Sequence, residues 1–144
     1  MINTNDGDNN IERVGLKEQI KLIIDKSGRS IKAARRLIED EDFDFASSRL
    51  YYAVYYAMEA VLLTKNISLS KHSGVISQFN QFYIKEGIFP KNFSKIISRL
   101  FRERQVGDYG FYIDITGEEI LEDAESAECF LDKIKEYLIK EELL

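Results

Sequence analysis

The chain has 144 residues, of which 44% are hydrophobic and 31% are charged, and its formal net charge at pH 7 is −5. This length suits one domain with a single core, and the composition is ordinary for a soluble globular protein. The acidic balance supplies no overall positive field, so any contact with RNA or a nucleotide must come from a local group of basic residues.

Cysteine content and segment hydrophobicity bear on the compartment. The one cysteine, Cys129, excludes an internal disulfide and suits a reducing environment. Residues 1–10 are polar and acidic and lack the basic and apolar regions of a signal peptide. No apolar run approaches the roughly 20 residues needed to cross a bilayer. We therefore expect a cytoplasmic protein that makes no membrane contact.

The N-terminal part of the chain predicts a tail and a long helix. Residues 1–10 carry little that could pack, so we expect a flexible tail ahead of a single helical domain over residues 11–144. A first helix is expected from about Glu12 to Glu39, and Ser27-Gly28 near its middle could kink it. Its apolar face repeats at helical spacing and consists of Ile20, Ile24, Ile31, Ala34 and Ile38.

Two further helices are expected in the middle of the chain. The second should run from Phe43 to Lys65, after an acidic turn, with an apolar stripe of Ala46, Leu50, Val54, Ala57, Val61 and Leu62. Ser70 is the expected N-cap of a third helix, and Gly87 and Pro90 should end it. One face of that third helix carries His72, Val75, Ile76, Phe79, Phe82 and Tyr83.

The last third of the chain predicts two more helices. A fourth begins near Phe93, with Ile96, Ile97, Leu100 and Phe101 on one face. The segment Thr116-Gly117-Glu118-Glu119 is a capping box that starts a fifth. Its stripe has near-heptad spacing suited to antiparallel packing and consists of Ile120, Ala124, Ala127, Leu131, Ile134 and Leu138. These periods predict an all-α up-and-down bundle of four to five helices.

Arg104 stands where the period of the fourth helix requires an apolar residue. It lies seven residues after Ile97 and four after Leu100. Burying a guanidinium without a partner is costly, so this arginine needs a carboxylate, a phosphate or an open cleft. An ion pair with Asp108 or with another helix would satisfy the requirement. A site that holds an anion is the alternative.

The second helix is unusual on its non-core side. A continuous stripe there consists of Arg49, Tyr52, Tyr56 and Glu59, flanked by Tyr51 and Tyr55. Tyrosine rings bury apolar area while their hydroxyls reach a polar partner. The stripe therefore predicts either a seal over the bundle with a dimer seam, or a platform on which a base stacks, with Arg49 beside it for a phosphate.

His72 is the one histidine and stands in the segment Lys71-His72-Ser73-Gly74. A helix N-terminus there would favour an anion, with Lys71 and Ser73 as further donors. A half-buried histidine, hydrogen-bonded inside the bundle, is the alternative. One histidine and one cysteine exclude a structural zinc set, and no glycine-rich phosphate loop is present. We therefore expect neither a metal nor a cofactor.

Three segments together resemble a known family. They are Ser48-Arg49-Leu50-Tyr51-Tyr52-Ala53, Lys71-His72-Ser73-Gly74, and Arg104 with Asp108-Tyr109. In this order they resemble small prokaryotic HEPN-domain proteins of the branch with an Arg-x-x-x-Asp-Tyr motif, over roughly Ile20 to Tyr137. The resemblance implies a dimerising bundle of about five helices, often encoded beside a minimal nucleotidyltransferase. Ribonuclease members cut RNA without metal and carry a histidine shortly after the arginine, which this chain lacks.

We therefore favour a homodimeric binding module that engages a minimal nucleotidyltransferase partner, a nucleotide or RNA in a cleft around Arg104, as in a toxin–antitoxin system. The candidate ligand-binding residues are Arg49, Tyr52, Tyr56, Lys71, His72, Arg104, Asp108 and Tyr109. One alternative is a metal-independent endoribonuclease toxin in which Arg104 stabilises the phosphorane charge and His72 or Asp108 moves the proton. The other is a purely structural bundle. The distance between His72 and Arg104 discriminates between binding and catalysis.

Overall fold

The computed structural model describes the backbone of residues 4–109 and 114–144, and the side chains of residues 12–106 and 114–144. The described backbone is helical and contains no strand. Its elements are α1 (Thr4–Glu39), α2 (Phe43–Leu63), α3 (His72–Phe79), the π-helical segment η1 (Asn80–Ile84), α4 (Asn92–Tyr109) and α5 (Gly117–Lys140). The predicted all-α bundle is therefore confirmed. Among the described residues, no helix combines the length and apolarity that a membrane span requires.

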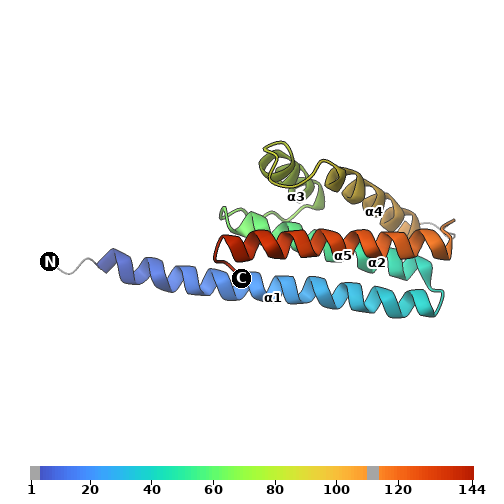
Figure 1. Ribbon diagram of the computed structural model, residues 1–144, viewed down its shortest axis with the longest axis horizontal. Helices are drawn as coiled ribbons and strands as arrows, with labels where there is room; N and C mark the ends of the chain where they lie inside the picture. The colour runs from blue at the N-terminus through green and yellow to red at the C-terminus, as the bar shows by residue number, and fades with distance from the viewer. Residues whose placement is uncertain (1–3, 110–113) are drawn as a thin grey trace.

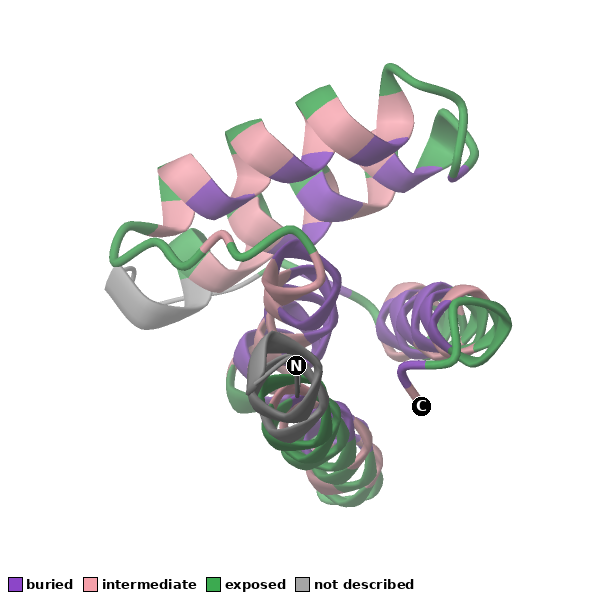
Figure 2. Ribbon diagram, turned by 90° about the vertical axis from the view of Figure 1, so that its left-hand side faces the viewer, coloured by how far each residue is buried: buried purple, intermediate pink, exposed green. Residues whose placement is uncertain are grey.

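The central element of the bundle is α2, which contacts α1, α3, α4 and α5. The helices α1, α2 and α5 lie lengthwise beside one another, and the first turns of α1 extend beyond the rest (Figure 1). Viewed along this long axis, α3 and α4 lie across the end-on helices as a second layer (Figure 2). The chain therefore surrounds α2 on several sides, which places its polar side chains against other helices as well as solvent.

The predicted apolar faces form the core. Every residue expected on the faces of the first, second and fifth helices is buried. A group of aromatic rings joins α3 and α4 to α5, and its closest pair is Phe93 with Phe130, whose ring centroids are 4.3 Å apart. Each of these rings buries a large apolar area, so together they stabilise this part of the core. The core thus follows the hydrophobic periods of the sequence.

Small polar residues of α1 join it to α2 through the backbone. Ser27 has no exposed surface, and its hydroxyl donates to the carbonyl of Ala53 at 2.6 Å. Ser30 donates in the same way to the carbonyl of Arg49 at 2.6 Å. The helix α1 continues through Ser27-Gly28 without a break. These short side chains serve close helix packing.

The helix boundaries correct two expectations. The helix α1 begins at Thr4, eight residues before the expected Glu12, because elongation of an existing helix adds one hydrogen bond for each residue fixed. Whether residues 1–10 are flexible stays a prediction. The N-cap of α3 is Lys71 and not Ser70. Lys71 has an extended backbone and its carbonyl accepts from the Val75 N–H, so the burial of Val75 fixes this helix start without a side-chain cap.

The expected turns are otherwise present. Gly87 adopts a left-handed conformation at φ +77°, which glycine tolerates, after the helical path has continued through η1. Thr116 caps α5, with its hydroxyl accepting a hydrogen bond from the Glu119 N–H at 3.1 Å. This bond confirms the predicted capping signal at the start of the fifth helix.

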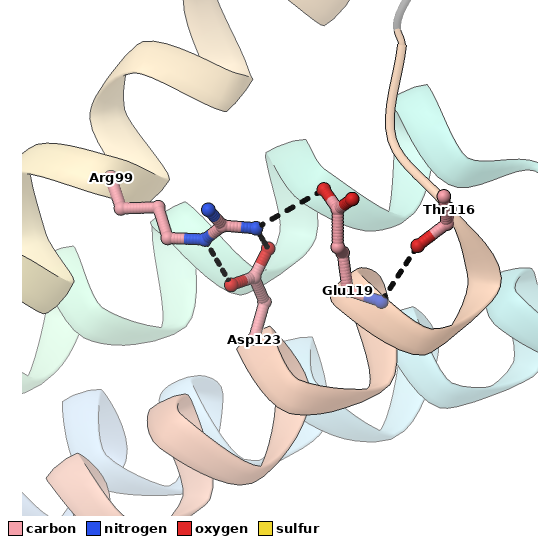
Figure 3. Close-up of polar contacts among 4 residues, drawn as sticks. All are labelled: Arg99, Thr116, Glu119 and Asp123. Atoms are coloured by element: carbon pink, nitrogen blue, oxygen red, sulfur yellow. Dashed lines mark hydrogen bonds and ion pairs between the residues drawn. The ribbon is translucent and has the colours of Figure 1, made fainter.

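An ion pair joins α4 to α5 at this same end of the bundle. The Arg99 Nε lies 2.6 Å from a carboxylate oxygen of Asp123, and the guanidinium lies 3.7 Å from Glu119 (Figure 3). Asp123 is only 3% exposed. The hydrogen bond to Asp123 is the main cause that raises the pKa of Arg99 above its ordinary value. A buried carboxylate without this partner would carry an uncompensated charge.

We expect Arg99→Ala to lower the free energy of unfolding by about 2 kcal/mol, because it leaves the Asp123 carboxylate buried without its cation. The partial exposure of Arg99 keeps the loss below that of a fully buried pair. Urea unfolding followed by circular dichroism measures the change. The matched control is Arg102→Ala, an exposed arginine of the same helix, which should cost less than about 0.5 kcal/mol. Equal losses in the two variants would contradict the role of the pair.

Candidate functional site

The tyrosines of α2 divide between the core and the accessible surface. Tyr51 has no exposed surface and Tyr55 is 7% exposed, so both belong to the core. Tyr52 and Tyr56 are partly buried and keep part of their rings accessible. The difference arises because α3 and α4 cover the side of α2 that a simple two-sided helix would expose. The accessible stripe is therefore narrower than expected.

His72 packs its ring into this tyrosine group from the first position of α3. Its ring centroid is 4.2 Å from that of Tyr55 in a stacked arrangement and 5.7 Å from that of Tyr52 in an edge arrangement. The Nδ1 atom lies 2.9 Å from the hydroxyl oxygen of Tyr51. The half-buried, hydrogen-bonded histidine that we weighed as an alternative is therefore present. It lies within a polar and aromatic cluster and not in a purely apolar core.

Arg104 reaches the same tyrosines from α4. Its guanidinium carbon lies 5.6 Å from the ring centroid of Tyr51 and 5.5 Å from that of Tyr52. One terminal nitrogen donates to the Tyr52 hydroxyl at 3.2 Å. A guanidinium over aromatic faces is attracted by their negative potential. The fold thus brings Arg104 and His72 together on Tyr51 and Tyr52 within one chain, and we call these four residues with Tyr55 the His72–Arg104 site.

The electrostatics of the site keep the imidazole neutral near pH 7. Burial lowers the pKa of His72 below its ordinary value, and the positive charge of Arg104 lowers it further. Burial also raises the pKa of Tyr51 well above its ordinary value, so its hydroxyl stays protonated. The site therefore presents the fixed positive charge of Arg104 beside a neutral histidine.

The hydrogen bond to Tyr51 selects a tautomer of this neutral histidine. Among the described residues, His72 Nδ1 is the hydrogen-bond partner found for the buried Tyr51 hydroxyl. A buried hydroxyl hydrogen requires an acceptor, so we assign Tyr51 as the donor and Nδ1 as the acceptor. The ring proton then resides on Nε2. In this tautomer Nε2 can donate a hydrogen bond but cannot accept a proton.

Further cations lie along the accessible stripe of α2. The guanidinium carbon of Arg49 lies 4.9 Å from the ring centroid of Tyr52. The Nζ atom of Lys26, from α1, lies 4.7 Å from the ring centroid of Tyr56. Lys26 was missed by the sequence reasoning, because its approach to α2 depends on how the two helices pack. Burial raises the pKa of Glu59, at the end of the stripe, while the charge of Lys26 opposes that rise. Lys71 is exposed at the start of α3.

The remaining predicted residues lie at the end of α4. The side chains of Asp108 and Tyr109 fall outside the described residues, so the Arg104–Asp108 pair stays a prediction. Within the described side chains, no group of three histidine, cysteine, aspartate or glutamate residues is arranged to hold a metal ion. The functional groups that the described side chains bring to this region are therefore cations, aromatic rings and one imidazole.

Comparison with known proteins identifies relatives over most of the chain. The family model described as "HEPN domain" matches residues 20–138. A protein of Methanocaldococcus jannaschii named "Putative toxin MJ0142" is 36% identical over 128 residues, which are 89% of this chain and 87% of that protein. A second protein of that organism, "Putative toxin MJ0605", is 34% identical over 85% of this chain and 91% of its own length. A "UPF0332 protein" of Thermotoga maritima is 38% identical over 73% of this chain and 80% of its own length.

We expect Arg104→Ala to raise the pKa of His72, because it removes a positive charge that disfavours the imidazolium. The pKa should still stay below the ordinary value of a histidine, since burial is the larger cause. A pH titration of the imidazole signals by NMR measures it unambiguously, because the chain has one histidine. Since the folded pKa is depressed, wild-type stability should fall as the pH drops below about 6.5, and His72→Gln should reduce this loss. A His72 pKa that Arg104→Ala leaves unchanged would contradict their proximity.

Proposed function

This chain belongs to the HEPN-domain family, and we propose that it is a binding module of a toxin–antitoxin-like system that engages a nucleotide or RNA at the His72–Arg104 site. The observation that carries the proposal is the meeting of Arg104 and His72 on the rings of Tyr51 and Tyr52. The names of the two relatives from Methanocaldococcus jannaschii support the toxin–antitoxin setting.

The site supplies the groups that a nucleotide requires. The Arg104 guanidinium can bind a phosphate through parallel N–H donors. Tyr52 is partly buried beside this guanidinium, and its ring is the aromatic group on which we propose that a base stacks. The Nε2–H of His72 adds a donor without adding charge. Together these groups favour a ligand that is anionic at one end and aromatic at the other.

The same geometry favours a binding function over a catalytic one. Metal-free RNA cleavage needs one group to take the 2′-hydroxyl proton and another to protonate the leaving oxygen. In the tautomer selected by Tyr51, His72 carries its proton on Nε2 and its Nδ1 is already engaged. Arg104 remains protonated at all physiological pH values. The site in this state therefore holds an anion more readily than it moves a proton.

A metal-independent endoribonuclease is the second candidate, and one observation favours it. The fold brings His72 beside Arg104, which supplies the imidazole that the sequence after Arg104 lacks. For cleavage, Nδ1 would have to carry the proton so that Nε2 could act as a base. In that tautomer Tyr51 would have to accept a hydrogen bond in place of donating one. The two candidates therefore differ in the direction of a single hydrogen bond.

We also propose a homodimer and a minimal nucleotidyltransferase partner. The dimer surface expected on the tyrosine side of α2 is largely covered by α3 and α4, so we place it on α1 and α5. These neighbouring helices expose Val14, Leu22 and Ile139 at 54%, 69% and 58%. Exposed apolar residues of this size mark interfaces when they gather on one face. Sedimentation velocity tests the proposal, and a monomer at micromolar concentration would contradict it.

We expect Arg104→Ala to weaken binding of a fluorescein-labelled single-stranded oligoribonucleotide about 10- to 100-fold. This range corresponds to the loss of hydrogen bonds to a charged group, about 1.5–3 kcal/mol. Fluorescence anisotropy measures the affinity. Arg102→Ala removes an exposed arginine from the same helix and should weaken binding less than about threefold. Equal effects of the two substitutions would refute the site.

The same oligonucleotide separates the two candidate functions. Incubated with the wild-type protein and a chelator, it should stay intact according to the binding proposal. Cleavage that His72→Ala reduces by about 100-fold or more would establish the endoribonuclease instead, since general acid–base groups contribute effects of that size.

A further inference from the structure

A groove between α1 and α2 is lined by basic side chains. Its volume is about 200 Å³, and Lys26 and Arg29 of α1 face Arg49 and Tyr56 of α2 across it. The rest of its lining consists of Ser30 and Ala33, so no acidic residue lines the groove. Ser30 fixes one wall, because its hydroxyl donates to the backbone carbonyl of Arg49. The groove is therefore a small cationic channel with one aromatic wall.

The three cations of this groove form no ion pair with an acidic residue among the described side chains, although the charge of Lys26 acts on Glu59 at the end of the α2 stripe. The ion pairs found there are those of Arg35, Arg99 and Lys133 with neighbouring carboxylates. The groove cations repel one another, in a chain whose 25 acidic residues outnumber its 20 lysines and arginines. Cations gathered on one part of an acidic protein create a local positive potential that attracts an anion. The arrangement is therefore suited to an anionic ligand.

A series of contacts between rings and cations connects the groove to the His72–Arg104 site. From the groove end, Lys26 lies 4.7 Å from the ring centroid of Tyr56, which lies 5.9 Å from that of Tyr52. Arg49 lies 4.9 Å from the centroid of Tyr52, whose hydroxyl accepts the hydrogen bond from Arg104. Each step is about the length of one helical turn. A ligand that fills both regions must therefore carry several anionic groups along its length.

We propose that this groove binds the phosphates of a single-stranded oligonucleotide whose neighbouring nucleotide occupies the His72–Arg104 site, an inference that rests on the proposed function. A cationic groove that follows the backbone, interleaved with aromatic rings for the bases, is the arrangement by which proteins hold single strands. A duplex would keep its bases from Tyr52 and Tyr56. A mononucleotide would fill the His72–Arg104 site and leave the cations of the groove uncompensated.

The experiment compares an adenylate decamer with adenosine 5′-monophosphate, each titrated into the full chain by calorimetry at several salt concentrations. We expect Lys26→Gln/Arg29→Gln to weaken decamer binding about tenfold and to leave the monophosphate unchanged. The logarithmic salt dependence of decamer binding should become shallower by about 0.7 for each lost phosphate contact. Arg104→Ala should weaken both ligands. The matched control is Lys17→Gln/Lys21→Gln, an exposed pair on another side of α1, with the same change of charge and no effect on the slope.

Each outcome decides one point. An unchanged decamer affinity and salt slope in the groove variant would overturn this inference, and the proposed function would stand if Arg104→Ala still weakened both ligands. If Arg104→Ala weakened neither ligand, the proposed function would fail. A decamer of glutamate that bound as tightly, with the same loss in the groove variant, would identify an acidic peptide as the ligand and overturn the assignment to nucleic acid. A melting curve followed by circular dichroism that matches the wild type in each variant would exclude unfolding as a cause.

Discussion

Tyr51 is the residue on which the arrangement of the site depends. Its ring is fully buried, and the ring centroid lies 5.6 Å from that of Phe101 in α4. Its hydroxyl oxygen lies 2.9 Å from Nδ1 of His72 in α3. A buried phenol must satisfy its hydroxyl hydrogen, and the imidazole does so at the first position of α3. The same ring lies under the Arg104 guanidinium. One side chain thus orients the histidine, selects its tautomer and supports the arginine.

This constraint explains why a charged residue is tolerated on the apolar face of α4. The aromatic faces of Tyr51 and Tyr52 attract the guanidinium, and the Tyr52 hydroxyl accepts one of its hydrogen bonds. The charge in turn disfavours protonation of His72, so the site holds one cation and not two. A single fixed charge with neutral donors around it suits recognition of a phosphate. The charge of Arg104 gives this acidic chain a local basic surface.

The sequence predicted what depends on local periodicity. The apolar faces, the number of helices and the Thr116 cap follow from the spacing of residues along single helices. It also singled out His72 and Arg104, each as an anomaly of its own helix. Their meeting was not predictable, because it depends on how α3 and α4 both pack on α2. The sequence also left open which tyrosines of α2 seal the bundle and which stay accessible, since a helix enclosed on several sides has no simple outer face.

The central claim is that Arg104 and His72 form one binding site, and a double-mutant cycle tests it most directly. The affinity for a labelled single-stranded oligoribonucleotide is measured for wild type, Arg104→Ala, His72→Gln and the double variant. If both side chains hold the same ligand group, the double variant should lose less than the sum of the single losses, by about 1 kcal/mol. Losses that add to within about 0.3 kcal/mol would show two independent residues and contradict the account.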